Sequence, residues 1–353
     1  MEFFIKASQL ILSLSILIVL HEFGHYLPAR WFKTRVEKFY LFFDYKFSLF
    51  KKKIGETEWG IGWIPLGGYV KIAGMIDESM DTEQMKKDPQ PWEFRTKPAW
   101  QRLIIMIGGV VVNLIVGILI YMMVLLVWGE DYLTNEDLPH GMMVDETFEQ
   151  YGFRNGDKVL KVGEETPMDV TDVNVMLFLR DYRQITVEHE DGVIEEIGLP
   201  EDIDYKMFKD DAVQAFIPRF YTVINMMDTT MSAHEAGFEV GDSLVSINGT
   251  EYEFYDQFKK ELKTHKEEEI QIGFYREGAY QELAVKTDTA GRLGFGPRGP
   301  AGLYDYRHKD YSFGESISGG FSLGMTTLSD YIAQLKFLFT SKGASSIGGF
   351  GAF

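Results

Sequence analysis

Residues 19–25 read Val-Leu-His-Glu-Phe-Gly-His and close a long apolar run at the start of the chain. On a helix, His21 and His25 lie one turn apart on the same face, so both rings can reach one Zn²⁺. Glu22 points about a quarter-turn away, where its carboxylate can hold a water molecule and accept its proton. The stretch therefore predicts a zinc site with His21 and His25 as ligands and Glu22 as general base.

The surroundings of this stretch argue against a chance pattern. Residues 3–20 are apolar apart from one Lys, one Gln and small hydroxyl residues, and an ionisable group inside such a span costs about 2.5 kcal/mol or more. We interpret residues 1–28 as a membrane helix that stops at Pro28, because the residue before a proline is disfavoured in a helix. A cleaved signal peptide is the competing interpretation, but Glu2 and the lack of a small-x-small cleavage site disfavour it.

Composition limits the possible partners and metal ligands. A length of 353 residues suits two or three domains, and a hydrophobic fraction of 45% is enough for packed cores. The formal net charge is -18. The acidity is concentrated in residues 129–311, which hold 39 acidic and 18 basic side chains. No basic face suited to phosphate is visible, so we exclude nucleic acid as a partner. The chain has no cysteine, so any metal must be held by His, Asp or Glu.

Residues 29–102 follow the first predicted helix and begin with a basic flank. Between residues 29 and 53 there are eight Lys and Arg against two acidic residues, which places this flank on the cytoplasmic side. Residues 57–73 then alternate bulky and small side chains around a Gly pair, a pattern that predicts a β-hairpin or looped sheet. The element is either an ordinary hairpin or a sheet edge near the metal, on which an extended peptide could add as a strand.

Residues 103–128 give the clearest membrane span, because residues 104–128 contain no formal charge. Asn113 is a polar residue in the middle of this span, and Gly108 and Gly109 precede it by about one turn. Small residues of this kind let a second helix approach closely. The amide is either a helix-packing group or a group that acts near the active site, and the sequence does not separate the two.

The acidic block repeats itself at an offset of 85 residues. Residues 152–157 and 237–242 both read Gly-Phe-x-x-Gly-Asp, and an alternating strand pattern follows each copy. A repeat of this length indicates a duplicated domain, so we predict two small α/β modules at residues 138–205 and 210–300. After them, residues 312–340 are the best candidate for a third membrane helix that tethers the block. Residues 341–353 are Gly-rich and look like a cut end.

These motifs together resemble the site-2 protease family of intramembrane zinc metalloproteases, and most of all its bacterial regulator-of-sigma-E branch. The resemblance rests on the His-Glu-x-x-His helix, on GIGWIPLGGYVK at residues 60–71, on GGVVVN at residues 108–113 and on the paired Gly-Phe-x-x-Gly-Asp motifs. It implies that the repeats are PDZ domains on the periplasmic side of the inner membrane. It also implies that residues 60–71 form a membrane-facing β-element that contacts substrate, with Gly62, Gly67, Gly68, Tyr69 and Asn113 as candidate substrate-binding residues.

The family's third zinc ligand, an Asp in an Asn-x-x-Pro…Asp-Gly motif, has no counterpart in the sequence. The single Asp-Gly pair, Asp191-Gly192, is better explained as a hairpin turn. Asp330 could in principle reach the metal from the third predicted helix. We instead expect the third ligand on a membrane helix beyond Phe353.

The sequence thus predicts a multi-pass α-helical membrane protein with a membrane-associated β-element and two periplasmic α+β PDZ-like domains. Its predicted function is that of a zinc metalloendopeptidase embedded in the lipid bilayer. The implied substrate is a single-span membrane protein, such as an anti-sigma factor that another protease has already trimmed during envelope stress. The alternatives are a membrane-tethered PDZ scaffold with a vestigial metal site, and a PDZ-bearing serine protease. The serine protease lacks support because the Gly-x-Ser-x-Gly pattern at residues 320–324 lies inside a predicted membrane helix and not at a strand-to-helix turn.

Overall fold

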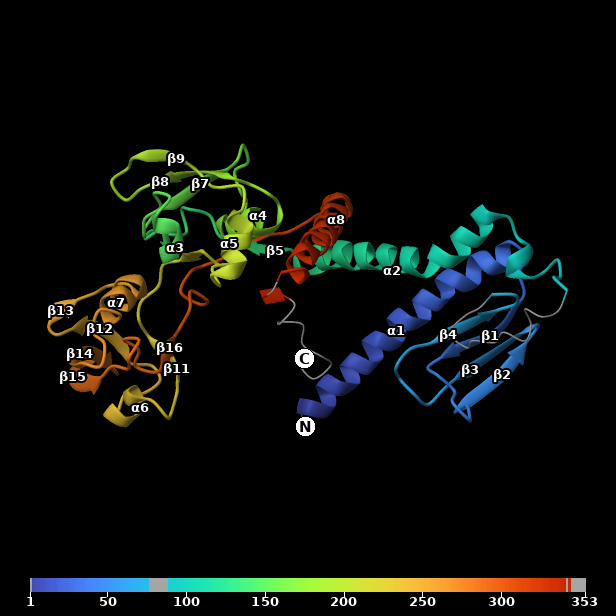
Figure 1. Ribbon diagram of the computed structural model, residues 1–353, viewed down its shortest axis with the longest axis horizontal. Helices are drawn as coiled ribbons and strands as arrows, with labels where there is room; N and C mark the ends of the chain where they lie inside the picture. Colours follow the sequence, from blue (N-terminus) through green and yellow to red (C-terminus); the bar gives the residue numbers. More distant parts are fainter. Residues whose placement is uncertain (1, 76–87, 341, 344–353) are drawn as a thin grey trace. The chain divides into compact units, whose positions relative to one another are not determined.

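The computed structural model describes residues 2–75, 88–340 and 342–343. Most of the Gly-rich segment predicted at residues 341–353 therefore lies outside the described residues. The chain divides into two compact units, each built from two stretches of sequence: Met1–Val127 with Ser312–Met325, and Trp128–Tyr311 with Thr326–Phe353. The first unit contains two long helices and a sheet, and the second contains two α/β modules (Figure 1).

The first unit is organised around helices α1 (Glu2–Trp31) and α2 (Ala99–Trp128). Among the described residues these two helices are long and apolar enough to cross a membrane, with mean hydropathies of 2.2 and 2.9. The prediction that α1 stops at Pro28 is wrong. Proline removes the helical hydrogen bond to Gly24, but its own carbonyl still accepts the N–H of Phe32 at 3.0 Å, so the helix continues to Trp31.

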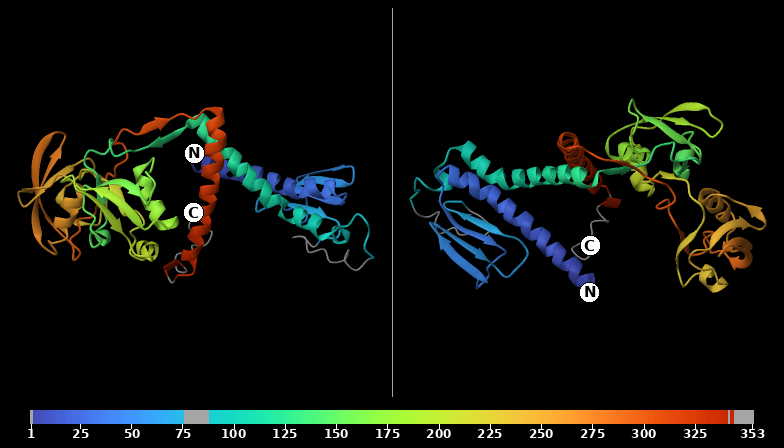
Figure 2. Two further views of the ribbon diagram at one scale, coloured as in Figure 1. Left: turned by 90° about the horizontal axis from the view of Figure 1, so that it is seen from above. Right: turned by 180° about the vertical axis from the view of Figure 1, so that it is seen from behind.

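A four-stranded sheet lies beside the C-terminal end of α1 (Figures 1 and 2). Its strands are β1 (Val36–Leu41), β2 (Phe50–Ile54), β3 (Thr57–Ile61) and β4 (Tyr69–Ile72), in the order β2-β3-β1-β4. Strand β1 pairs parallel with β3 and antiparallel with β4. Of the two alternatives predicted for residues 57–73, the hairpin is wrong, because β1 separates β3 from β4, whereas a looped sheet agrees with the structure. Strands β2 and β4 are the two edges of the sheet.

An apolar cluster joins this sheet to both long helices. Phe39 and Trp59 stack with ring centroids 4.6 Å apart, and Phe23 of α1 packs against both rings. The fully buried Ile105 brings α2 into the same cluster. Burial of such side chains contributes roughly 1.5–3 kcal/mol each, so the cluster fixes the sheet against the end of α1 that carries the His-Glu-x-x-His motif. A short 3₁₀ turn, η2 (Phe94–Thr96), leads into α2.

The acidic block in the second unit contains two modules, each with its own apolar core. Module 1 consists of β6 (Met142–Val144), α3 (Glu146–Glu149), β7 (Lys158–Val162), η3 (Val170–Asp172), α4 (Val173–Leu179), β8 (Gln184–Glu188), β9 (Ile194–Gly198), α5 (Ile203–Lys209) and β10 (Phe216–Pro218). Module 2 consists of β11 (Ile224–Met227), α6 (Ser232–Ala236), β12 (Ser243–Ile247), β13 (Thr250–Glu251), α7 (Tyr255–Leu262), β14 (Glu269–Arg276), β15 (Ala279–Lys286) and β16 (Phe295–Pro297).

The predicted boundary between the modules, at residues 205–210, comes too early. Strand β10 pairs with β6, and Phe216 is buried in the core of module 1. Module 1 therefore extends to Pro218, and module 2 begins at Ile224. No pattern in the sequence marks β10, since the segment after α5 is short and does not alternate apolar and polar residues.

The repeated Gly-Phe-x-x-Gly-Asp motif is a structural turn in both modules. Asp157 accepts the backbone N–H of Arg154 at 2.8 Å, and Asp242 accepts the N–H of Glu239 at 2.8 Å. The second glycine of each copy has a φ near +100°, which favours glycine, and each Phe is buried. The motif therefore closes a tight turn before the strands β7 and β12.

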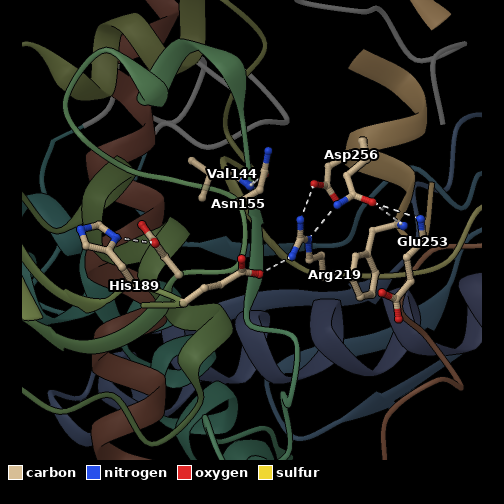
Figure 3. Close-up of polar contacts among 10 residues, drawn as sticks. Val144, Asn155, His189, Arg219, Glu253 and Asp256 are labelled. Atoms are coloured by element: carbon tan, nitrogen blue, oxygen red, sulfur yellow. Dashed lines mark hydrogen bonds and ion pairs between the residues drawn. The ribbon is translucent and has the colours of Figure 1, made fainter. Parts of the chain in front are cut away.

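Arg219 links the two modules within the second unit (Figure 3). Its guanidinium donates to both carboxylate oxygens of Asp256 at 3.0 and 2.9 Å and to Glu190 of module 1 at 2.6 Å. The same group lies over the ring of Phe254, 4.4 Å from its centroid. Because the Arg219 side chain is only 6% exposed, this bidentate pair is a fixed joint between the modules.

The first and last strands of the acidic block are neighbours in the second unit. Strand β5 (Glu130–Tyr132) pairs antiparallel with β17 (Arg307–Lys309), so the entry and exit strands of the block lie side by side. Helix α8 (Phe313–Leu338) follows and covers the range predicted for a third membrane helix. Its first half packs on α2 in the first unit, where Gly320 contacts the backbone of Met122. Crossing of a membrane by α8 stays a prediction.

Candidate metal centre

The two histidines of the motif converge on one point. The Nε2 atoms of His21 and His25 lie 3.2 Å apart, and the ring planes meet at 77°. Two nitrogen ligands at about 2.0–2.1 Å from a tetrahedral Zn²⁺ lie roughly 3.3 Å apart. The pair therefore fits two of the ligand positions of a zinc ion, as the one-turn spacing predicted.

The other ring nitrogens are held by α2. His25 Nδ1 donates to the carbonyl oxygen of Ile105 at 2.7 Å, and His21 Nδ1 lies 3.1 Å from Nδ2 of Asn113. A carbonyl can only accept, so the Ile105 contact puts the proton of His25 on Nδ1 and leaves the lone pair of Nε2 for a metal. Helix α2 thus orients both rings, although it contributes no imidazole or carboxylate itself.

Glycines allow α2 to approach α1 this closely. A Cβ at Gly109 would lie 2.5 Å from His25 Nε2 and 2.6 Å from His21 Nε2, far inside any real contact distance. Gly24 and Gly108 meet backbone to backbone, and the carbonyl of Gly24, which Pro28 leaves without a helical donor, lies against Gly108. The prediction that Gly108 and Gly109 admit a neighbouring helix is confirmed, and the neighbour is α1.

Glu22 lies at the junction of α1 and the sheet. Glu22 is buried, with 9% of its surface exposed. Gly68, just before β4, lies next to it: a Cβ added at Gly68 would be 3.4 Å from Glu22 Cγ. The structure therefore places a buried carboxylate on α1 next to the strand predicted to contact substrate.

The other predicted substrate-binding residues of the sheet segment lie in the sheet core or in the loops between its strands. Tyr69 is buried, stacks on Tyr40, and donates its hydroxyl to Asp44 at 2.9 Å, so its side chain belongs to the sheet core. Gly62 and Gly67 lie beside Phe43 in the chain segments that connect the strands. Of the candidate residues in the sheet segment, Gly68 lies next to Glu22, whereas Asn113 of α2 contacts His21.

The rest of a zinc site is not found within the described part of the chain. Residues 2–75, 88–340 and 342–343 contain no group of three or more His, Asp, Glu or Cys side chains suited to a metal. Asp330, the alternative third ligand, accepts two hydrogen bonds from Arg180 at 3.1 and 2.9 Å. Its carboxylate is engaged in that ion pair, and an aspartate beyond Phe353 stays the predicted third ligand.

Two features of the centre were not predicted. The Ile105 carbonyl leaves no signal in the sequence, because any residue could supply it. Gly24 had a visible signal, since it occupies a variable position of the motif opposite Gly108 and Gly109. A small residue between the two histidines is what a close helix crossing needs.

A second candidate site is a groove in module 2. It has a volume of about 770 Å³ and lies between α7 and the segment that leads into β16. Its lining includes three methionines, the α7 residues Phe258 and Leu262, and four charged residues: Asp228, Lys259, Lys263 and Arg292. The methionines and apolar helix residues suit a peptide with apolar side chains.

Comparison with known proteins gives a consistent result. A model of peptidase family M50 matches residues 9–350. A protein of Neisseria meningitidis is 27% identical over 93% of this chain and 74% of its own length, and one of Vibrio cholerae is 28% identical over 79% and 62%. Both names contain the words "putative zinc metalloprotease".

Metalloprotease MmpA of Caulobacter vibrioides is 30% identical over 50% of this chain and 47% of its own length. The chain spans less than two thirds of several relatives, including 62% of the Vibrio cholerae protein and 30% of a Thermotoga maritima zinc metalloprotease homologue. The match to the family model nevertheless covers nearly all of the chain. The chain therefore belongs to peptidase family M50, the site-2 protease family of zinc metalloproteases that the sequence resemblance indicated.

Proposed function

We propose that this chain forms most of an intramembrane zinc metalloendopeptidase that hydrolyses a peptide bond of single-span membrane proteins. The observation that carries the proposal is the convergence of the His21 and His25 Nε2 atoms, 3.2 Å apart, between two helices with the length and composition of membrane spans. His21 and His25 hold the zinc together with the aspartate expected beyond Phe353.

Zinc bound at such a site supplies Lewis acidity, which polarises the scissile carbonyl and lowers the pKa of the attacking water. Glu22 accepts the proton of that water and passes it to the leaving amine, as a general base and then a general acid. Its position on α1, one residue after His21 and largely shielded from solvent, keeps the carboxylate close to the metal without making it a ligand.

Strand β4 presents the substrate in this proposal. A transmembrane helix hides its carbonyls in internal hydrogen bonds, so it must unwind before attack. As an edge strand, β4 has backbone groups that can pair with an extended peptide, and Gly68 brings its start next to Glu22. Substrate is recognised through the backbone of this strand, because the side chains of Tyr69 and Val70 are buried.

We place the protein in the bacterial inner membrane as a multi-pass protein. The basic flank after α1 favours a cytoplasmic location for the sheet and for the motif end of α1. The acidic block lies on the periplasmic side, where its modules act as PDZ domains. The substrate class is an anti-sigma factor, trimmed beforehand by another protease in an envelope stress response. A membrane-tethered PDZ scaffold is the second candidate, and the peptide-sized groove of module 2 favours it.

The test separates metal binding from proton transfer in the full-length protein. We expect Glu22→Gln to retain zinc and to lose turnover by about 10²–10⁴-fold, since it removes a general base and not a ligand. His21→Ala and His25→Ala should lose both zinc and activity. Zinc content by metal analysis, and cleavage of a single-span substrate in detergent or vesicles, are the two measurements.

Glu56→Gln is the matched control, because Glu56 is an exposed carboxylate in a surface pair with Arg30. It should change neither zinc content nor turnover. Full activity of Glu22→Gln would remove Glu22 from the mechanism. Wild-type protein that binds zinc but cuts no membrane protein would leave the scaffold as the better function.

A further inference from the structure

The side chain of Asn113 is the polar group on α2 that faces the metal centre. Its Nδ2 atom lies 3.1 Å from His21 Nδ1, and its Oδ1 atom is buried and has no hydrogen-bond partner. A buried amide oxygen without a partner costs roughly 1–3 kcal/mol. An amide retained for helix packing alone would be expected to bond the backbone of the neighbouring helix, whereas this one contacts a ring nitrogen of the motif.

The two histidines differ in how their protons are fixed. The Ile105 carbonyl accepts only, so His25 always carries its proton on Nδ1 when the ring is neutral. Asn113 can present either a donor or an acceptor to His21, because turning its amide by about 180° exchanges oxygen and nitrogen. The tautomer of His21 therefore depends on which end of the amide faces the ring.

With Nδ2 facing the ring, one chain of hydrogen bonds joins all four groups. Asn113 donates to His21 Nδ1, His21 Nε2 donates to His25 Nε2 across 3.2 Å, and His25 Nδ1 donates to Ile105. This arrangement puts the proton of His21 on Nε2, where it blocks metal binding. His21 can bind a metal through Nε2 only after its proton moves to Nδ1, and Nδ1–H then needs an acceptor.

We propose that Asn113 is a positioning residue for the zinc ligand His21, and that its amide turns to present Oδ1 to the Nδ1–H when Nε2 takes the metal. An amide suits this role better than a carboxylate, because it can serve both tautomers and adds no charge to the apolar helix α2. Groups that orient a metal-bound histidine change metal affinity by about 10–100-fold when they are removed. The inference rests on the zinc site of the proposed function.

The experiment measures zinc affinity of the full-length protein in detergent by competition with a chelator. Asn113→Leu removes the acceptor, so we expect zinc affinity to fall by about 10–100-fold. Asn113→Asp keeps an oxygen acceptor for Nδ1–H, so its affinity should equal or exceed that of the wild type. Gln101→Leu, which removes an amide near the start of the same helix, should leave zinc affinity unchanged.

Nitrogen NMR of ¹⁵N-histidine-labelled protein supplies a second readout, independent of cleavage. At a zinc concentration that saturates the wild type, His21 of the wild type should be protonated on Nδ1 only, whereas Asn113→Leu should retain a population of metal-free His21. Wild-type zinc affinity in Asn113→Leu, or equal loss in the Leu and Asp variants, would overturn the inference. Failure of the wild type to bind zinc would instead overturn the proposed function.

Discussion

At the scale of single residues, the two modules use the same motif with different partners. The Asp of Gly-Phe-x-x-Gly-Asp pairs with His189 in module 1, at 2.6 Å, and with Arg276 in module 2, at 2.8 and 2.6 Å. Both Asp157 and Asp242 are about 1% exposed, so each carboxylate depends on its partner for compensation. Arginine stays charged at every accessible pH, whereas histidine does not.

We predict that module 1 becomes less stable as the pH rises through the pKa of His189. Burial disfavours the charged form of His189, but its hydrogen bonds with Asp157 and Glu195 outweigh burial and raise its pKa above the ordinary value. A raised pKa in the folded state stabilises it below the unfolded pKa of about 6.5, and this stabilisation is lost as the pH rises through the folded pKa. His189→Gln should cost about 1–3 kcal/mol at pH 6 and less at pH 9.

Denaturant unfolding of the full-length protein, with hydrogen exchange followed in module 1, measures this difference. His234→Gln is the control, because His234 is exposed on α6. An equal cost of His189→Gln at both pH values would show that the histidine acts by packing and not by its charge.

Sequence spacing predicts some residues of the metal centre but not others. The positions of His21 and His25 follow from the 3.6-residue period of a helix, so the sequence predicted the pair that the structure brings together. The role of Asn113 could not be resolved, because a polar residue in an apolar helix has several possible partners. The Ile105 carbonyl could not be predicted at all, since backbone groups are the same in every residue.

At the scale of elements, the second half of α8 packs on module 1. Phe337 is 4% exposed and stacks on Phe178 of α4, with centroids 4.5 Å apart. Arg180 binds Asp330 bidentately, and Lys336 pairs with Asp204 at 2.5 Å. Asp330 and Lys336, two charged residues within the predicted third membrane helix, therefore attach this helix to the module.

We expect this attachment to depend mainly on Phe337. Truncation of a buried Phe to Ala costs about 3–5 kcal/mol, whereas a partly exposed ion pair contributes about 1 kcal/mol or less. In Phe337→Ala, amide protons of residues 326–338 should exchange faster than in the wild type. Phe339→Ala is the control, since Phe339 is 90% exposed two residues later. Equal exchange in the two variants would contradict a docked helix end.

The long apolar helices were easier to predict from the sequence than the short strands. The ranges of α2 and α8 agree with long apolar stretches, which have few alternatives. Strands β1 and β2 were missed because residues 29–53 were interpreted only as a basic flank. The exposed edge strand β2 also has no buried face to produce an alternating pattern. The hairpin error over residues 57–73 follows from the same omission.

At the scale of the whole molecule, the acidic block is an insertion with adjoining ends. Because Tyr132 of β5 is paired with Arg307 of β17, a two-residue turn can replace residues 133–306 without disturbing the β5–β17 pair. We expect the modules to restrict access of substrates with bulky external domains. The deletion variant should then cut untrimmed substrates that the intact full-length enzyme leaves uncut, as cleavage assays with trimmed and untrimmed substrates would show.

A groove variant distinguishes this restriction from capture of a substrate end. Gly296→Leu fills the groove of module 2 at modest strain, because a Cβ there would meet only the flexible end and Cβ of Met226, at 3.2 and 3.6 Å. If the modules capture an end, Gly296→Leu and the deletion should both lose cleavage of trimmed substrates. If neither variant changes the cleavage of either substrate, the modules have no part in selection.

The lining of that groove also makes module 2 sensitive to oxidants. Met226, Met227 and Met231 all face the groove, and Met226 is 65% exposed. Peroxide converts methionine into a polar sulfoxide, which methionine sulfoxide reductases can reverse. The chain has no cysteine to react first. Oxidation would therefore turn an apolar peptide groove into a polar one, and the binding of apolar peptides by module 2 would follow the redox state of its surroundings.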